Sequence, residues 1–298
     1  MAVGEIISAA RYNAMQSKIA QVLGIGTGNF GYGQSLASAQ LAISNTVNAT
    51  HMQKLKADTI NAYQHQNNSN PTMADVAVSA DITDAVYVQY EAVINTVYAN
   101  KLTYDVNQVT APESKVSSLR TTEWGGGGDP QTIIHEFTVT FTNVNHFRNF
   151  FNSGGEVRMR ATLTNGASAN TKYVEWQSML TSVNILTMNY LNSTASSGTS
   201  FTVGAYDLTT AFKTLWTKSG SGVYNDNLIT YKAKLVSNVM TFRIEYFDGT
   251  PLPGIEPGTS GTDERVIGKF TSIVEQQRAT GSYVEVATPL YANTVVLG

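Results

Sequence analysis

Apolar side chains recur every three or four positions in the first third of the chain, which is the spacing of an amphipathic helix. Within residues 9–23 this apolar face consists of Tyr12, Met15, Ile19, Val22 and Leu23. Ser8 stands before the pattern as a candidate N-cap, and Gly24 follows it as a candidate left-handed C-terminal cap. The pattern therefore predicts a helix between Ser8 and Gly24.

Two further segments carry the helical spacing. One begins after Asn48, a second candidate N-cap, and places Met52 and Leu55 on its apolar face. The other begins near Thr83, and its apolar face consists of Val86, Tyr90, Val93, Ile94 and Val97. The polar segment 64–71 between them is typical of a loop. The first hundred residues therefore predict a helical region.

Beyond residue 131 the spacing changes to an alternation of two, which is typical of half-buried strands. His135, Phe137, Val139 and Phe141 alternate with polar neighbours, and residues 157–163 repeat the pattern. Further strands are predicted at 182–190, 228–235, 239–247, 266–274 and 283–287, with short helical segments at 144–151 and 208–216. The fold class that follows is α+β, with a helical N-terminal region and an antiparallel β-sandwich domain.

The strongest break in the chain is the run of four glycines at 125–128, which Asp129 and Pro130 follow. We place the domain boundary between about Lys101 and Pro130. The predicted organisation is a helical docking region at 1–110, a Gly-rich linker at 111–130 and the sandwich domain at 131–298.

The low fraction of charged residues indicates a surface made mainly of neutral polar groups. Apolar residues make up 42% of the chain, close to the norm for globular proteins, but charged residues make up only 14%, where about a quarter is typical. Ser, Thr, Asn and Gln together occupy 97 of the 298 positions. Neutral polar groups cost less to desolvate than ions, so such a surface suits burial against many neighbouring subunits. A secreted or salt-adapted β-protein is the alternative.

Charge and cysteine usage exclude several classes of partner. The formal net charge is -3 and no segment is rich in Lys and Arg, so we expect no binding to nucleic acid. The longest apolar runs fall short of the ~20 residues of a membrane helix, and no secretory leader is recognised, so no membrane association is expected. The chain has no cysteine, which excludes disulfides and thiolate chemistry.

Residues 26–31 match the dinucleotide-binding pattern G-x-G-x-x-G, but a predicted helix precedes them where that motif needs a strand. The four histidines, His51, His65, His135 and His146, have no zinc-ligand spacing. No G-x-S-x-G nucleophile elbow is present. We therefore expect no cofactor, no metal and no catalytic residues.

Glycoside hydrolysis is the enzyme class that needs the closest attention, because it requires two carboxyl groups facing each other across a cleft. The candidates on predicted strands or at their edges are Glu136, Glu156, Glu175 and Glu245. Solvated strand faces explain all four equally well. The 15 tyrosines, with Trp124, Trp176 and Trp216, could stack on sugars, but core and interface packing is the simpler interpretation.

Several segments, in chain order, resemble a family of virion structural proteins from tailed phages of cyanobacteria. They are residues 7–13 (ISAARYN), 22–24 (VLG), 31–34 (GYGQ), 84–91 (DAVYVQYE), 137–142 (FTVTFT), 150–155 (FFNSGG), 206–209 (YDLT) and 277–282 (QRATGS). The resemblance implies a non-enzymatic particle component located in the virion. It leaves open the tail, baseplate, fibre region, neck or capsid surface, and it supplies no catalytic residues.

The resulting hypothesis is a structural or adaptor protein that contacts other virion proteins and forms a homo-oligomer. Short helices cannot build a full core alone, so we expect their apolar faces to be buried, partly against another chain. The expected assembly contacts are Tyr12, Met15, Ile19, Tyr32, Met52 and Leu55. The alternatives are a receptor-binding module that recognises a host-surface glycan, a capsid or neck decoration protein, and a depolymerase.

Overall fold

The computed structural model describes residues 8–78, 80–125, 131–164, 170–249 and 265–297. The chain divides into two compact units. The helical unit comprises Met1–Ala111, Val144–Gly155 and Arg278–Thr288, and the sandwich unit comprises Pro112–Asn143, Glu156–Gln277 and Pro289–Gly298. The α+β prediction is confirmed, because helices dominate the N-terminal part and two antiparallel sheets follow it. No helix in the described ranges has the length and hydropathy needed to cross a bilayer.

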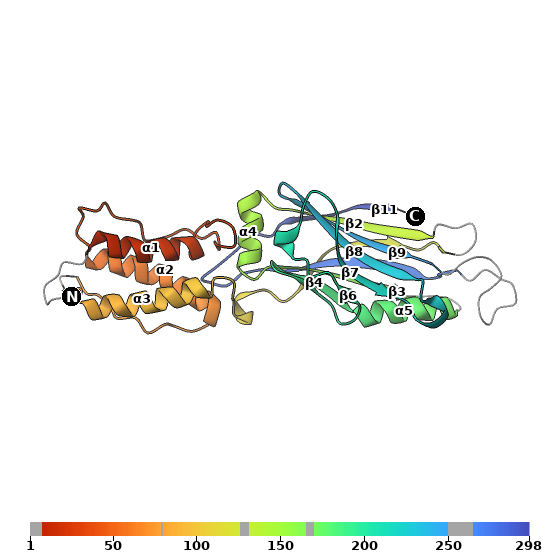
Figure 1. Ribbon diagram of the computed structural model, residues 1–298, viewed down its shortest axis with the longest axis horizontal. Helices are drawn as coiled ribbons and strands as arrows, with labels where there is room; N and C mark the ends of the chain where they lie inside the picture. Colours follow the sequence, from red (N-terminus) through yellow and green to blue (C-terminus); the bar gives the residue numbers. More distant parts are fainter. Residues whose placement is uncertain (1–7, 79, 126–130, 165–169, 250–264, 298) are drawn as a thin grey trace. The chain divides into compact units, whose positions relative to one another are not determined.

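The helical unit begins with three helices that lie side by side (Figure 1): α1 (Ala9–Leu23), α2 (Ala49–Asn67) and α3 (Asp84–Ala99). The predicted N-caps Ser8 and Asn48 are confirmed, and the side chains of Ser8, Asn48 and Thr83 each accept a hydrogen bond from a main-chain N–H three residues later. The apolar faces of all three helices are buried against one another.

The three helices run parallel. Contacts join α1 to α3 at both ends, from Arg11 with Asp84 to Gln21 with Tyr98, and the ring of Tyr12 contacts His51 in the first turn of α2. Parallel neighbours need long return connections. The connection before α2 is held in place by buried Asp58, whose carboxylate accepts hydrogen bonds from the main chain of Ala37 and Ser38.

The helix predicted between Ser8 and Gly24 is confirmed, but two details of the helix ends are wrong. Gly24 does not adopt the left-handed conformation, because its φ is -74° and its N–H continues the helical bonding by donating to the carbonyl of Ala20. The predicted loop at 64–71 begins later, because α2 continues to Asn67 and ends at Asn68, whose φ of 49° is left-handed. Asparagine tolerates that conformation because its short polar side chain bonds locally.

A fourth helix, α4 (Val144–Asn152), completes the helical unit from a distant part of the sequence (Figure 1). Phe147, Phe150 and Phe151 are its buried apolar side chains. Arg148 Nη2 donates to the carbonyl of Gly26 at 3.1 Å, and Asn152 Nδ2 donates to that of Gly31 at 3.3 Å. The helical unit therefore includes residues from outside the predicted 1–110 region.

The short helix η1 (Val106–Gln108) ends the N-terminal part of this unit, and the isolated bridge between Val109 and Ala279 joins it to the segment 278–288. Gln34 Nε2 donates to the main-chain carbonyl of Glu285 at 2.9 Å and fixes the same segment from another side. Residues 283–287, predicted to be a strand, form no ladder here.

The sandwich unit consists of two antiparallel sheets and one helix. The five-stranded sheet has the order β1 (Glu113–Arg120), β10 (Lys269–Gln277), β3 (Glu156–Thr164), β4 (Ile185–Met188) and β5 (Ser193–Thr194). The six-stranded sheet has the order β11 (Leu290–Leu297), β2 (Thr132–Thr140), β9 (Val239–Phe247), β8 (Leu228–Val236), β7 (Lys213–Ser219) and β6 (Thr199–Ser200). The short helices η2 (Ala205–Asp207) and η3 (Gly222–Tyr224) lie in connections.

The inward faces of the strands carry the predicted alternation. In β2 the odd-numbered residues from Ile133 to Val139 are buried, and in β3 so are Val157, Met159, Ala161 and Leu163. Aromatic rings join the two sheets, because Tyr246 of β9 lies 4.4 Å from Phe270 of β10, between ring centroids. The core is therefore a face-to-face packing of two sheets, as expected for a sandwich.

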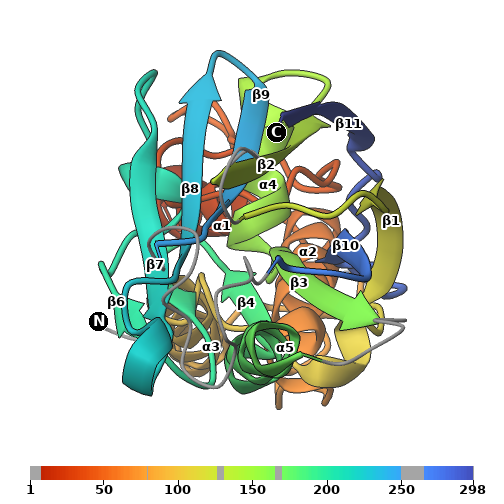
Figure 2. The same cartoon turned by 90° about the vertical axis from the view of Figure 1, so that its right-hand side faces the viewer.

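The last helix, α5 (Thr171–Val183), was not predicted, and it packs along β3 (Figure 2). Trp176 contacts Trp124, Tyr246 and Phe270, which places α5 over the core. The strand predicted at 182–190 is shortened to β4 because α5 occupies its beginning.

Three further sequence predictions are wrong. The segment 111–130, expected to be a linker, contains β1, which pairs with β10 along its length. The segment 208–216, expected to be helical, contains the start of β7. The strand predicted at 266–274 lies three residues later, as β10. The glycines at 126–128, with Asp129 and Pro130, fall outside the described residues.

Candidate functional site

The predicted assembly contacts lie in the core of the helical unit. Their side chains are covered by the chain itself, with at most 2% exposed. The six residues are Tyr12, Met15, Ile19, Tyr32, Met52 and Leu55. Residues that are already covered offer no surface to another chain, so an assembly contact of this unit has to come from other side chains.

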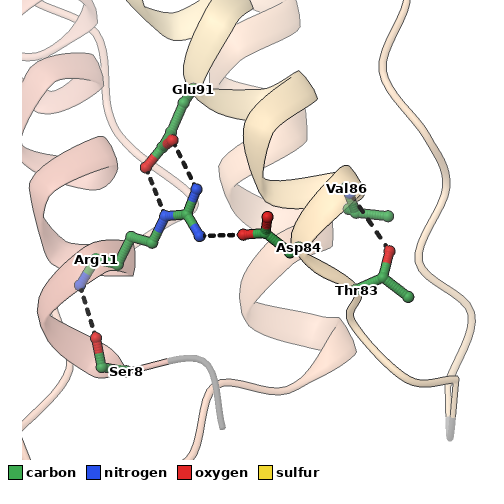
Figure 3. A network of polar contacts seen from close by, with 6 residues as sticks. All are labelled: Ser8, Arg11, Thr83, Asp84, Val86 and Glu91. Carbon is green, nitrogen blue, oxygen red and sulfur yellow. Dashed lines mark hydrogen bonds and ion pairs between the residues drawn. The ribbon is translucent and has the colours of Figure 1, made fainter. Parts of the chain in front are cut away.

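An ion network clamps the first turns of α1 and α3 (Figure 3). Arg11 Nε and Nη2 donate to the two oxygens of Glu91, each at 2.8 Å, and Nη1 donates to Asp84 Oδ1 at 2.6 Å. The guanidinium also lies 5.1 Å from the ring centre of Tyr87. The hydrogen bond from Arg11 lowers the pKa of Glu91 below its ordinary value. This network fixes how the two helices align and leaves no nitrogen of the guanidinium without a carboxylate partner.

The glycine pattern at 26–31 is a turn that closes on itself. Gly26 and Gly31 have φ of 60° and 104°, and a Cβ on Gly31 would lie 2.0 Å from the carbonyl oxygen of Ile25. The chain then returns along the end of α1, where the N–H of Tyr32 donates to the carbonyl of Val22. The glycines thus serve a close backbone approach, and the strand that a dinucleotide site requires before the loop is replaced by α1.

The four histidines lie in four different settings. His51 Nδ1 accepts from the N–H of Asn48 and completes a capping box at the start of α2. His146 bonds through Nε2 to the carbonyl of Ala287. His65 is buried beside the ring of Tyr32, and burial lowers its pKa to about 4. Within the described ranges, no group of three or more His, Asp or Glu side chains is arranged to hold a metal ion.

His135 is part of a polar chain inside the sandwich. Its Nδ1 lies 2.6 Å from Ser272 Oγ, which in turn lies 2.7 Å from the hydroxyl of Tyr246. All three side chains are fully buried. Burial, with a contribution from the charge of Arg120, lowers the pKa of His135 to about 4. A histidine and a serine in contact suggest nucleophilic chemistry, but this pair faces the core, where no substrate can reach it.

A fully buried ion pair links α5 to the end of β9. Lys172 Nζ lies 3.0 Å from Asp248 Oδ2, and neither side chain is exposed. Ionised groups without contact to water require partners, so this pair fixes the start of α5 over the sheet. Sequence reasoning missed both residues, because neither has a distinctive spacing.

The four candidate carboxylates interact with other groups of the protein. Glu136 and Glu245 flank Arg243 on the outer face of the six-stranded sheet, where Glu136 accepts a hydrogen bond from its guanidinium and Glu245 forms an ion pair with it at 3.6 Å. Glu245 also pairs with Lys232 Nζ at 2.6 Å. Glu175 accepts from the N–H of Ser221 at 2.6 Å. The fourth, Glu156, lies half-buried on the outer face of β3. These contacts explain Glu136, Glu175 and Glu245 as structural residues.

The tryptophans do not form a sugar-stacking surface. Trp124 and Trp176 are buried in the sandwich core, and Trp216 is only 7% exposed. Trp216 Nε1 donates to the carbonyl of Ser197 at 2.9 Å, which fixes the connection between the two sheets. The core interpretation of these residues therefore agrees with the structure.

The described part of the sandwich unit has a groove of about 300 Å³ between α5 and β3. It exists because β4 pairs with β3 only from Val157 to Arg160, so the edge of β3 beyond Arg160 faces a helix where a strand would otherwise lie (Figure 2). Tyr173 Oη and Gln177 Nε2 donate to the carbonyl of Leu163 and cover one point of this edge.

The lining of the groove combines polar and apolar residues. The lining residues are Arg160, Ala161, Thr162, Leu163 and Thr164 from β3, and Gln177, Leu180, Thr181 and Asn184 from α5 and its cap. The sequence does carry a signal for α5, because Tyr173, Trp176, Leu180 and Val183 follow Asn170 at helical spacing. The groove itself depends on how long β4 is, which the local pattern does not show.

With this geometry in place, the chain was compared with protein-family models, with curated proteins and with solved structures, and none of the three comparisons found a match.

Proposed function

We propose that this chain is a non-enzymatic structural or adaptor protein of a phage virion, a component of the tail, the baseplate or the fibre attachment. Two features support this proposal: the resemblance of segments along the whole chain to cyanophage virion proteins, and a surface with few charges. In this proposal the helical unit docks onto neighbouring virion proteins, and the sandwich unit faces outward or contacts a neighbour.

One structural observation carries the docking role of the helical unit. Ile43 and Val78 are 87% and 76% exposed, and each stands five residues before the N-cap of the next helix, Asn48 or Thr83. Because α1, α2 and α3 run parallel, these N-caps lie at the same end of the helical unit. A partner that covers these exposed aliphatic side chains removes their apolar surface from water. This burial stabilises the complex by roughly 25 cal/mol per Å² of apolar area.

Particle incorporation tests the docking role. An infected host would supply the chain with Ile43→Ser and Val78→Ser together, and mass spectrometry of gradient-purified particles would measure its copy number relative to the major capsid protein. We expect incorporation to fall at least tenfold, while circular dichroism shows an unchanged helix content.

Val106→Ser is the matched control, because Val106 is 73% exposed in the same unit but lies in η1, after the C-terminal end of α3. Normal incorporation of the Ile43/Val78 double variant would refute docking through this end. Absence of the unaltered chain from purified particles would refute the virion role as a whole.

The contacts of the candidate carboxylates support the non-enzymatic part of the proposal. Glycoside hydrolysis needs one carboxyl group as a proton donor and a second one facing the same bond. Glu136 and Glu245 instead share the guanidinium of Arg243. We expect purified protein to release no reducing sugar from host polysaccharide, with or without divalent metal. Turnover that disappears in Glu136→Gln or Glu245→Gln would contradict this expectation.

The groove between α5 and β3 favours a second candidate function. A receptor-binding module that recognises a host-surface glycan requires a solvent-accessible site with polar groups, and this groove is such a site. Such a module would still be a virion component, so both proposals predict particle incorporation. They differ in whether the purified chain binds a sugar.

A further inference from the structure

We infer that the groove between α5 and β3 binds one acidic sugar unit of a polysaccharide, with the sugar carboxylate at Arg160 and the sugar hydroxyls along the threonine and amide side chains. The inference deepens the glycan-binding alternative, but it does not depend on the virion role. The chemistry of the lining residues carries it.

Arg160 lines one end of the groove and forms an ion pair with Glu275 of β10. Its Nε donates to Glu275 Oε1 at 2.7 Å, which holds the guanidinium in place. Its terminal nitrogens, Nη1 and Nη2, have no protein partner within the described part of the chain. None of the residues that line the groove is acidic. Two free nitrogens of a positioned guanidinium match the two oxygens of a carboxylate.

The remaining polar groups are neutral and free to bind a ligand. The side chains of Thr162, Thr164, Thr181 and Asn184 make no hydrogen bond to another described residue. Hydroxyl and amide groups both donate and accept hydrogen bonds, as sugar hydroxyls do. This combination suits a polyhydroxylated ligand better than it suits a simple anion, which needs donors only.

The two walls are arranged so that a ligand can contact both. Arg160, Thr162 and Thr164 alternate on one face of β3, and Gln177, Thr181 and Asn184 follow each other at helical spacing on α5. α5 and β3 run in opposite chain directions. Gln177, early in this part of α5, contacts Leu163 near the end of β3, whereas Ile185, just after Asn184, pairs with Arg160 in the middle of β3. Arg160 and Asn184 therefore share one end, where the carboxylate would lie.

The size of the groove sets the size of the ligand. A volume of about 300 Å³ is at the lower limit of small-molecule sites, so it holds a single sugar ring. Ala161, Leu163 and Leu180 are the apolar residues that line the groove. The groove is open to solvent on its outer side, so the rest of a polysaccharide chain could continue outside it.

Binding of a matched pair of sugars to the full chain tests the inference. Methyl glucuronide and methyl glucoside differ only in a carboxylate in place of a hydroxymethyl group. Titration followed by ligand-observed NMR should give a dissociation constant of about 1–10 mM for the glucuronide, a typical value for one small contact. The glucoside should bind at least tenfold more weakly.

Two variants locate the site on the protein. Thr181→Leu fills the groove from an exposed helical position, and Ser178→Leu makes a similar change to an exposed residue of α5 that does not line the groove. We expect Thr181→Leu to weaken glucuronide binding at least tenfold and Ser178→Leu to leave it unchanged. Arg160→Gln should reduce glucuronide binding to the level of the glucoside. Tryptophan fluorescence would verify that each variant is folded.

Three results would overturn the inference. The first is that glucuronide shows no saturable binding up to a 50-fold molar excess at millimolar protein. The second is that Thr181→Leu and Ser178→Leu have equal effects on binding. The third is that acetate binds as tightly as the glucuronide. Each can occur while the chain still joins particles through Ile43 and Val78, so failure here is distinguishable from failure of the docking role.

Discussion

Two histidines are buried, one in each unit, and their charge state is therefore part of the folding equilibrium. His135 has a folded-state pKa of about 4, below the value of about 6.5 for an unfolded chain. The unfolded state thus binds the proton first as the pH falls. Burial of neutral His135 therefore contributes fully to the free energy of unfolding above about pH 6.5. As the pH falls toward 4 the free energy of unfolding decreases by an amount on the order of 3 kcal/mol.

The variant His135→Gln should remove this pH dependence from the sandwich unit. All three tryptophans belong to that unit, so denaturant unfolding followed by tryptophan fluorescence reports on it. We expect the unfolding free energy of the variant to change less between pH 6.5 and pH 4 than that of the unaltered chain. His146→Gln, a change in the helical unit, is the control, and an equal slope for all three proteins would contradict the assignment.

The buried pair of Lys172 and Asp248 gives a second prediction for single residues. Lys172→Met removes one charge and leaves the carboxylate of Asp248 in the core without its ammonium partner. We expect a loss of about 3–5 kcal/mol in the unfolding free energy of the sandwich unit. Lys232→Met, which removes a half-buried ion pair with Glu245, should cost only about 1 kcal/mol. Similar losses for the two variants would show that burial of the first pair is incomplete in solution.

Among the elements, α4 depends on a glycine more than a hundred residues earlier. Gly33 has a φ of 78°, and a Cβ there would lie 2.3 Å from Asn149 Nδ2 on α4. Gly33→Ala should therefore destabilise the helical unit by about 2–3 kcal/mol, through backbone strain and a displaced α4. Gly28→Ala is a matched control, since Gly28 has a φ of 58° but open space around the added Cβ. Ellipticity at 222 nm during denaturant unfolding measures both, and equal losses would contradict the contact with α4.

The clamp between α1 and α3 gives a prediction for a pair of helices. Arg11→Lys keeps the charge but cannot bond both oxygens of Glu91 and reach Asp84 at the same time. We expect a loss of about 1 kcal/mol, because the network is partly exposed to solvent. The pKa of Glu91 is lowered in the folded chain. The ion pair therefore stabilises the fold fully above the ordinary pKa of a glutamate, and this stabilisation disappears as the pH falls through the lowered pKa. The loss caused by Arg11→Lys should therefore shrink at low pH. A loss that stays constant from pH 7 to pH 3 would contradict this account.

The accuracy of the sequence predictions varied from element to element for a physical reason. β2, β3 and β9 follow the alternation of buried and less buried residues, and the pairings β2–β9, β8–β9 and β3–β10 have no register shift. The sequence pattern predicted β2, β3, β8 and β9. β1, β7 and β11 each contain a shift, at Ser114/Val116, Thr214/Trp216 and Asn293/Val295. A bulge inserts one residue and reverses the alternation, so a period of two does not reveal these strands. The three N-caps were predictable because each bond spans three residues.

At the scale of the whole molecule, the chain segments that form each unit could not be derived from local patterns. α4 was predicted as a helix, but its place in the helical unit depends on Asn149 meeting Gly33 and Asn152 meeting Gly31. A deletion of residues 1–110 would therefore remove most of a unit that also contains α4 and residues 278–288. The groove beside β3 has the same origin, because it follows from the pairing of β4 with only part of β3.

The proposed homo-oligomer is a property of the whole molecule, and its response to salt follows from the surface composition. With 14% charged residues, contacts between copies would consist of neutral hydrogen bonds and apolar area, which salt affects little. Exposed ion pairs contribute about 0–1 kcal/mol each and are screened as the Debye length falls from about 10 Å at 0.1 M salt to about 3 Å at 1 M. Sedimentation velocity of the purified chain should therefore show one oligomer of unchanged size from about 0.05 to 1 M sodium chloride. A monomer at every concentration would refute the oligomer, and an oligomer that dissociates as salt rises would show that its few charges hold it together.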